Sequence, residues 1–237
     1  MSITDSIKKA LSSCADPKKA AHLQRFFRTG PGEYGEGDRF LGIKVPDGRA
    51  VAKRYYKDVS FNGIGELLES EIHEHRLTAL FMLVLKFEKS RDETEKARII
   101  DLYLKYLDRV NNWDLVDSSA PKILGAWLFD KDRALLYELA RTGHLWRQRA
   151  AVLSTFYFIK HGDFSDALQI AELLLGHPHD LIHKAAGWML REIGNRDRET
   201  EEAFLKKHYK KMPRTMLRYA IEKFEPEIRS RYLNGSK

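Results

Sequence analysis

Apolar residues recur along most of this chain with the period of an α-helix rather than that of a strand. The segment TEKARIIDLYLKYLDRV shows this well, because Ile99, Leu102, Tyr103, Tyr106 and Val110 fall on one side of a helix. Similar segments are separated by short polar breaks such as GHPHD and GNRD, and strand-like alternation is rare. The sequence therefore predicts an all-α protein.

Five of the expected helices resemble one another, since each opens with a polar residue that small or apolar residues follow. They span residues 74–87, 115–129, 146–160, 181–194 and 215–224. Aligned on Arg76, Asp117, Arg149, Lys184 and Arg218, they are separated by 41, 32, 35 and 34 residues. This spacing is typical of a repeat of two helices. We therefore expect residues 1–237 to form a single domain, an α-solenoid of antiparallel helix pairs.

Equivalent helices of such a solenoid lie side by side, with axes ~8–10 Å apart, so Asp117, Arg149 and Lys184 would line up. Trp113 precedes Asp117 by four residues and Trp188 follows Lys184 by four. Each tryptophan therefore shares a helix face with its aligned residue. The spacing predicts a concave surface that carries two indoles, one carboxylate and two cations.

One segment, residues 28–49, interrupts the helical pattern with six glycines and two prolines. We expect a long loop there, and its tip is expected to be acidic through Glu33, Glu36 and Asp38, which disfavours phosphate contact by the tip. The glycines resemble a dinucleotide-binding fingerprint only superficially, because no strand precedes them and the spacing differs.

The chain has 237 residues, of which 43% are hydrophobic, so it is long and apolar enough to bury a sizeable core. Lysine and arginine outnumber aspartate and glutamate by 41 to 34, which gives a net charge of +7. This excess favours an anionic partner, with nucleic acid ahead of a membrane surface, and the alternative is charge that serves solubility alone. Basic clusters at residues 53–57 and 206–218 could contact phosphates or simply be solvated.

The single cysteine, Cys14, allows no disulfide framework, which is typical of a reducing compartment. The first residues lack the apolar core of a signal peptide, and no apolar run reaches the ~18 residues of a membrane span. We therefore expect a soluble, cytoplasmic protein that does not enter membranes.

Asp117 is less easily explained by local structure than Asp114. A helix that Asn111 or Asn112 caps would begin near Trp113, and Asp114 would then stabilise its first turn. Asp117 lies beyond that turn, and Pro121 has no N–H to donate to its carbonyl, so a kink is expected. The alternatives are a solvent-facing aspartate on a kinked helix and a functional carboxylate beside an indole.

Other candidate residues also have structural explanations. Each tryptophan could pack in the core, and Arg149 could be paired and half-buried instead of holding an external anion. The histidines of HPHDLIH lack acidic or cysteine partners, which disfavours a metal site. Signatures of a serine or cysteine nucleophile are absent from the sequence.

Three motifs of this chain, NNWDLVDSSAP, LWRQRAAVL and IHKAAGWMLRE, occur in order and resemble those of the AlkD-like DNA alkylation-repair glycosylases. The resemblance covers about residues 10–225. It implies a HEAT-like repeat fold with a concave DNA-binding face. It also implies excision of positively charged alkylated purines, of the 3-methyladenine and 7-methylguanine type, from double-stranded DNA in base excision repair.

The resemblance assigns roles to individual residues. Asp117 matches the catalytic aspartate, Trp113 and Trp188 match its aromatic partners, and Arg149 matches the arginine beside the lesion. A tyrosine of the family's N-terminal helix corresponds to Phe26, which lacks the hydroxyl. The residues expected to contact DNA are Phe26, Lys184, Arg214 and Arg218.

The implied chemistry suits these residues. A base alkylated on a ring nitrogen is already cationic and leaves as a neutral molecule, so the reaction needs no general acid. Positive charge then develops on the sugar, where a carboxylate stabilises it and orients water, and where an indole face attracts the same cation. We therefore expect neither cofactor nor metal, and a monomer as the acting species.

Two alternatives remain at this point. Some members of the family bind unusual DNA structures without cleaving them, so a non-catalytic HEAT-repeat protein that binds damaged or branched DNA is one of them. A protein-interaction solenoid with a basic face is the other. The joint presence of Asp117, both tryptophans and Arg149 favours the glycosylase.

Overall fold

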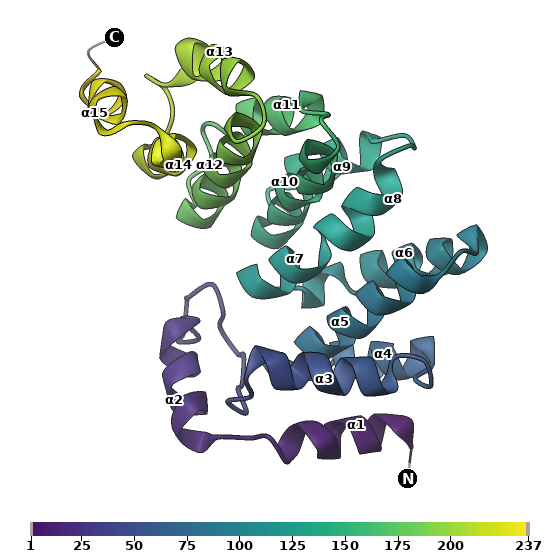
Figure 1. Ribbon diagram of the computed structural model, residues 1–237. Helices are drawn as coiled ribbons and strands as arrows, with labels where there is room; N and C mark the ends of the chain where they lie inside the picture. Colours follow the sequence, from purple (N-terminus) through teal and green to yellow (C-terminus); the bar gives the residue numbers. More distant parts are fainter. Residues whose placement is uncertain (1, 236–237) are drawn as a thin grey trace. The chain divides into compact units, whose positions relative to one another are not determined.

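The computed structural model describes residues 2–235, and these residues form helices joined by short connections and by a long loop at residues 27–44 (Figure 1). Extended pairing within this part of the chain is limited to an isolated bridge between Arg39 and Ile72. The chain divides into two compact units, Met1–Ser119 and Ala120–Lys237, which we call the N-terminal and C-terminal units. The expectation of a single domain stays a prediction.

The N-terminal unit is built around its longest helix, α5. Helices α1, α3, α4, α6 and α7 all pack against α5, and its residues Leu80 and Leu83 are fully buried (Figure 1). The helices are α1 (Ile3–Ser12), α2 (Pro17–Phe26), α3 (Val45–Tyr55), α4 (Phe61–Leu68), α5 (His73–Lys89), α6 (Glu93–Lys105) and α7 (Trp113–Ser119), with a short 3₁₀ turn at Leu107–Arg109.

Local sequence fixes where several of these helices begin. Ser2 and Asp5 form a capping box at α1, and Asp16 accepts hydrogen bonds from the first backbone N–H groups of α2, where Pro17 occupies the first position. Ser60 and Asp92 cap α4 and α6 in the same way. Such caps satisfy N–H groups that have no partner inside the helix.

The C-terminal unit stacks helix pairs in the manner of a solenoid. Helices α10, α12 and α14 pack side by side (Figure 1). Helix α9 packs on α10, α11 packs on both α10 and α12, and α13 packs on α12. The elements are a π-helical turn (Pro121–Gly125), α8 (Ala126–Leu128), α9 (Ala134–Arg141), α10 (Leu145–Lys160), α11 (Ser165–Leu173), α12 (Asp180–Gly194), α13 (Arg198–His208), α14 (Arg214–Ala220), a 3₁₀ turn (Ile221–Lys223) and α15 (Pro226–Asn234). The all-α solenoid that the sequence predicts is confirmed.

The aligned residues of the five similar helices occupy equivalent places. Asp117, Arg149, Lys184 and Arg218 are each the fifth residue of α7, α10, α12 and α14, and Arg76 is the fourth of α5. Close approach of two of these helices depends on Gly187, because a Cβ atom there would lie 2.4 Å from the carbonyl oxygen of Met216 in α14. The small residues of the motif therefore serve helix packing.

The expected irregularity after Asp117 takes the form of a wide turn. Gly125 donates its N–H to the carbonyl of Ala120 over 2.9 Å, five residues back, which is the hydrogen bond of a π-helix. Pro121 begins this turn and supplies no N–H of its own. The expected helix over 115–129 is consequently divided into α7, the π-helical turn and α8.

None of the helices within residues 2–235 offers an apolar stretch of the length that crossing a bilayer requires.

Candidate nucleic-acid interface

Helix α7 begins where the sequence predicts and carries two of the expected site residues. The side-chain oxygen of Asn112 accepts the N–H of Trp113 over 2.9 Å, and its backbone carbonyl accepts that of Val116 over 3.1 Å. Trp113 therefore occupies the first turn, and Asp117 lies one turn later on the same face. Both side chains are partly exposed.

Aromatic rings surround Trp113 on the side of the N-terminal helix α2. Phe27 stacks on the indole with ring centroids 5.1 Å apart, and Phe26 meets it edge-on at 6.1 Å. Phe40 stacks on Phe27 at 5.0 Å and on His73 at 4.5 Å. We call these five residues the aromatic cluster, and its outermost ring, Phe26, is 55% exposed. The structure thus brings Phe26 and Trp113 together.

Asp117 is a half-buried carboxylate whose negative charge acts on a tyrosine in the core of the N-terminal unit. Tyr103 is fully buried below it and shares a hydrogen bond of 2.9 Å with Ser119. Burial raises the pKa of Tyr103, and the negative charge of Asp117 raises it further. A charge that acts over a low-dielectric interior is screened less than one on the open surface.

A second group of charges lies behind Trp113 and was not predicted from sequence. The two ring nitrogens of His73 lie 2.9 Å from Oδ2 of Asp38 and 2.8 Å from Oδ2 of Asp114. Arg76 donates to the other oxygen of Asp38 over 2.5 Å, and Asn112 donates to Asp38 over 3.3 Å. We call these five residues the charged network. Burial alone would lower the pKa of His73, but the two carboxylates raise it to about 9.

The glycine-rich loop is fastened to the start of α5. The carboxylate of Glu74 accepts the backbone N–H groups of Leu41, Gly42 and Ile43 at 2.8–3.2 Å. Gln24 donates to the backbone carbonyl of Asp38 over 2.5 Å. A carboxylate that accepts several backbone N–H groups is a strong anchor.

Two expectations about this loop were wrong. It spans residues 27–44, because Val45 starts α3 with Pro46 in its first turn, where proline is well tolerated. Asp38 is buried in the charged network and is no part of an acidic tip. The polar run HEHR, which opens an otherwise apolar helix, was the sequence signal for these buried partners.

In the C-terminal unit, Arg149 reaches from α10 to the start of α12. One of its terminal nitrogens donates to the carbonyl of Leu181 over 2.5 Å, and the residue is 5% exposed. The positive charges of Arg149 and Lys184 both act on the nearby His179, whose pKa burial lowers first of all. Lys184 also pairs with Asp180, one turn earlier, at 3.1 Å. Two of the aligned cations therefore both act on the same histidine.

Trp188 lies partly exposed on α12, one turn after Lys184. Its ring lies 5.6 Å from that of Phe156 on α10, and its indole N–H donates to Glu192 over 3.2 Å. Lys160 lies 4.5 Å above Phe156. The indole thus joins an aromatic pair that carries both acidic and basic neighbours.

The expected DNA-contacting arginines belong to α14. Arg218 is exposed, and Arg214 is exposed while it donates to the carbonyl of Leu233. Basic side chains follow one another at the end of α13, where Lys207 pairs with Glu172 at 3.1 Å. The exposed lysines of this stretch are Lys206, Lys207, Lys210 and Lys211.

The sequence pattern of the DNA alkylation repair enzyme family matches residues 7–224. The chain belongs to this family. A solved structure described as a predicted DNA alkylation repair enzyme from Enterococcus faecalis has the same fold, with a TM-score of 0.68 and 15% identity over 90% of this chain and 97% of the other. No curated protein matches the chain.

For this alkylation-repair family member, the expected site residues lie in both units. Trp113, Asp117 and Phe26 belong to the N-terminal unit, and the others belong to the C-terminal unit, where Arg149 and Lys184 both act on His179. The expectation that all of them share one concave surface stays a prediction.

The histidines of HPHDLIH hydrogen-bond within the protein. His177 lies 2.9 Å from Gln148, and His183 lies 2.5 Å from the carbonyl of His177. His179 accepts the N–H of Leu181 over 3.1 Å. Across residues 2–235, no group of histidine, cysteine and carboxylate side chains has the arrangement of a metal site.

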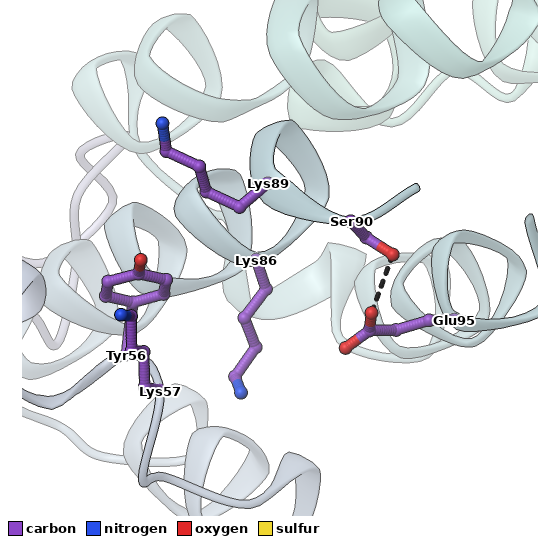
Figure 2. A pocket seen from close by; sticks show the side chains of 6 residues that line it. All are labelled: Tyr56, Lys57, Lys86, Lys89, Ser90 and Glu95. Carbon is purple, nitrogen blue, oxygen red and sulfur yellow. Dashed lines mark hydrogen bonds between the residues drawn. The ribbon is translucent and has the colours of Figure 1, made fainter. Parts of the chain in front are cut away.

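A pocket of about 260 Å³ lies apart from these residues in the N-terminal unit. Its lining includes three lysines and the hydrogen-bonded pair Ser90 and Glu95, whose oxygens are 2.6 Å apart. Figure 2 shows that Lys86 and Lys89 point in different directions. These two lysines therefore do not converge on one point as in a phosphate cradle.

Proposed function

We propose that this member of the DNA alkylation repair family is a glycosylase that removes positively charged alkylated purines from double-stranded DNA. The observation that carries the proposal is the position of Asp117, a half-buried carboxylate one helical turn from an indole that the aromatic cluster orients. This pairing of a fixed negative charge with aromatic surface suits a cationic ligand.

The main catalytic requirement of this reaction is stabilisation of the positive charge that develops on the sugar. When the bond between the sugar C1′ and the alkylated purine breaks, its electron pair moves to the ring nitrogen and neutralises the departing base. The sugar becomes an oxocarbenium-like cation, which the carboxylate of Asp117 stabilises. A water molecule then bonds to C1′ and gives its proton to solvent or to the carboxylate.

The aromatic residues contribute in the same direction. A cation over the face of Trp113 or Trp188 gains ~0.5–2 kcal/mol, depending on how far it is desolvated. Phe26, which replaces the tyrosine expected from the resemblance, extends the aromatic surface next to Trp113 without a hydroxyl. We therefore infer that Phe26 contributes to recognition of the lesion through aromatic contact area and not through a hydrogen bond.

Binding to DNA is assigned to basic residues of the C-terminal unit. Lys184, Arg214 and Arg218 provide phosphate contacts, whereas the buried Arg149, which donates to the carbonyl of Leu181, holds the start of α12 beside the DNA. The net charge of +7 supports an electrostatic mode of binding that is independent of sequence. We propose that the protein acts as a cytoplasmic monomer, with neither cofactor nor metal.

The decisive experiment is incubation with a duplex that carries one 7-methylguanine, followed by incision of abasic sites with an abasic-site endonuclease at neutral pH, beside a sample without this protein. The expected result is a cut at the modified base in that duplex and an intact unmodified duplex. The competing function is binding of damaged or branched DNA without catalysis. Tight binding of the modified duplex without abasic sites would support that function and refute the glycosylase.

A further inference from the structure

The charged network connects three segments of the N-terminal unit through one histidine. Its ring nitrogens face Asp38 of the loop and Asp114 of α7, while His73 itself opens α5. The side chain of His73 is 2% exposed and that of Asp114 is 16% exposed. The histidine thus links the start of α5 to the start of α7.

The geometry requires a protonated imidazole. Both ring nitrogens must donate, because each faces a carboxylate oxygen within hydrogen-bond distance, and a neutral ring can donate from only one of them. The other charged groups around His73 are Arg76, which pairs with Asp38, and Arg109, whose charge acts on Arg76. With His73 protonated, the charges of His73, Arg76, Asp38 and Asp114 cancel, which burial favours.

We propose that His73 is a positioning residue for base excision, because its cation holds Asp114 and so fixes the start of α7 that carries Trp113 and Asp117. The proposal rests on the proposed function for its effect on excision. Asp114 transmits the constraint directly, since its other oxygen accepts the backbone N–H of Leu115 over 2.9 Å.

The position of α7 depends on contacts with other segments of the N-terminal unit. The helix has seven residues, so it contains few hydrogen bonds of its own. His73 also contacts the aromatic cluster, with its ring 5.2 Å from that of Phe27, which stacks on Trp113. A displacement of about 1 Å at a reacting group can cost about 10²-fold in rate. Loss of the proton from His73 would remove one of its two hydrogen bonds to these carboxylates and loosen α7.

Asp114→Asn tests the link without emptying the core, because asparagine keeps the size and the hydrogen bond to Leu115. The matched control is Asp101→Asn, which removes a carboxylate from an exposed position of α6. We expect Asp114→Asn to slow single-turnover excision of 7-methylguanine about 10- to 100-fold. Affinity for DNA should change less than twofold, and Asp101→Asn should match the wild type.

The pH profile separates positioning from a general loss of stability. Excision by the wild type should fall as the pH passes about 9, because His73 then loses its proton. Asp114→Asn should move this alkaline limb to lower pH, since one carboxylate no longer favours the cation. A wild-type rate for Asp114→Asn, or an alkaline limb that does not move, would overturn the proposal.

Two spectroscopic measurements test the role of His73 without relying on glycosylase activity. Nitrogen-15 spectra of the histidines, assigned with His73→Gln, should show both ring nitrogens of His73 protonated at pH 7.5. Trp113 fluorescence, taken as the difference from Trp113→Phe, should change as His73 titrates. If the wild type excises nothing but both signals behave in this way, the proposed function fails while the link to α7 stands. A singly protonated His73 at pH 7.5 would overturn the link itself.

Discussion

Phe27 lies against Trp113 as a stacked pair, with ring centroids 5.1 Å apart and planes inclined by 17°. Phe27 is buried, so it acts as a fixed wall for one face of the indole. Phe26 is its exposed neighbour and meets the indole edge-on. Two consecutive residues at the end of α2 therefore have different roles. Phe27 packs against Trp113 in the core, and Phe26 extends the aromatic surface of Trp113 to solvent.

Asp117→Asn should separate catalysis from binding. Asparagine is nearly isosteric but carries no negative charge for the sugar cation, so single-turnover excision of 7-methylguanine should fall by ~10²–10³, about 2.7–4 kcal/mol. DNA binding should be equal or slightly tighter, because a negative charge near phosphates is lost. The exposed Asp101→Asn is the charge-matched control, and equal excision by Asp117→Asn and wild type would remove Asp117 from the mechanism.

Phe26→Ala and Phe26→Tyr should differ in their effects on excision. The alanine variant loses aromatic surface that is already half in solvent, so the melting temperature should change little while excision slows about 3- to 10-fold, which corresponds to ~0.5–1.5 kcal/mol. The tyrosine variant keeps the ring and should excise like the wild type. A tyrosine variant that is faster by more than tenfold would show that the missing hydroxyl matters.

Affinity for duplex DNA should fall steeply with salt. Each phosphate contact contributes about 0.9 to the slope of log affinity against log salt, so Lys184→Gln and Arg218→Gln should each lower that slope by about 0.9. Lys9→Gln, on the exposed surface of α1, is the control and should leave the slope unchanged. Binding that does not respond to salt would contradict phosphate contact by these residues.

Buried Glu201 in α13 should make the protein less stable at alkaline pH. Burial raises its pKa to about 8, and one of its oxygens has no hydrogen-bond partner. The folded protein therefore holds a proton that the unfolded chain releases above about 4.5, so stability falls as the pH rises from about 4.5 to 8. Glu201→Gln should remove this part of the pH dependence and raise stability at pH 9 by ~1–3 kcal/mol.

Urea unfolding of the wild type and Glu201→Gln at pH 6 and pH 9 measures the difference directly. The contribution of His73 is common to both proteins and cancels in the comparison. Its pKa is also raised, to about 9, so its stabilisation is complete below about 6.5 and is lost as the pH rises through 9. Parallel curves for the two proteins would mean that Glu201 is ionised in the fold.

Gly187→Ala should destabilise the C-terminal unit through a clash of helices. A Cβ atom would lie 2.4 Å from the carbonyl oxygen of Met216 and 2.6 Å from Cβ of Tyr219, so α12 and α14 would have to separate at a cost of ~1–3 kcal/mol. Gly176→Ala is the control, because nothing lies within 4 Å of the added atom. Thermal melts that rank the two variants equally would contradict this close approach.

Helical periodicity predicted most of the fold because it is a local property of the chain. The expected helix over 181–194 is α12, Asp180–Gly194, and that over 146–160 is α10, Leu145–Lys160. Pro121 marked the place where a helix would be disturbed, although the periodicity could not tell a kink from a π-helical turn.

The charged network could not be predicted in the same way. Asp38 lies in an irregular loop, and its partner His73 is 35 residues away, so only the fold brings them together. The position of Asp114 in the first turn of α7 is by itself a sufficient reason for a carboxylate there. The sequence therefore contains no sign of its hydrogen bond to His73. The residues Trp113 and Asp117 were found because they share one helix face.

Because the glycine-rich loop is anchored on both sides of its tip, the tip should tolerate insertions. Glu74 holds residues 41–43, Gln24 holds Asp38, and Gly35 packs so closely that a Cβ atom would lie 2.5 Å from the carbonyl oxygen of Phe27. The exposed residues 31–33 lie outside these anchors. Because a longer flexible loop adds little closure entropy, a tag or sensor peptide inserted there would leave the helices beneath it undisturbed.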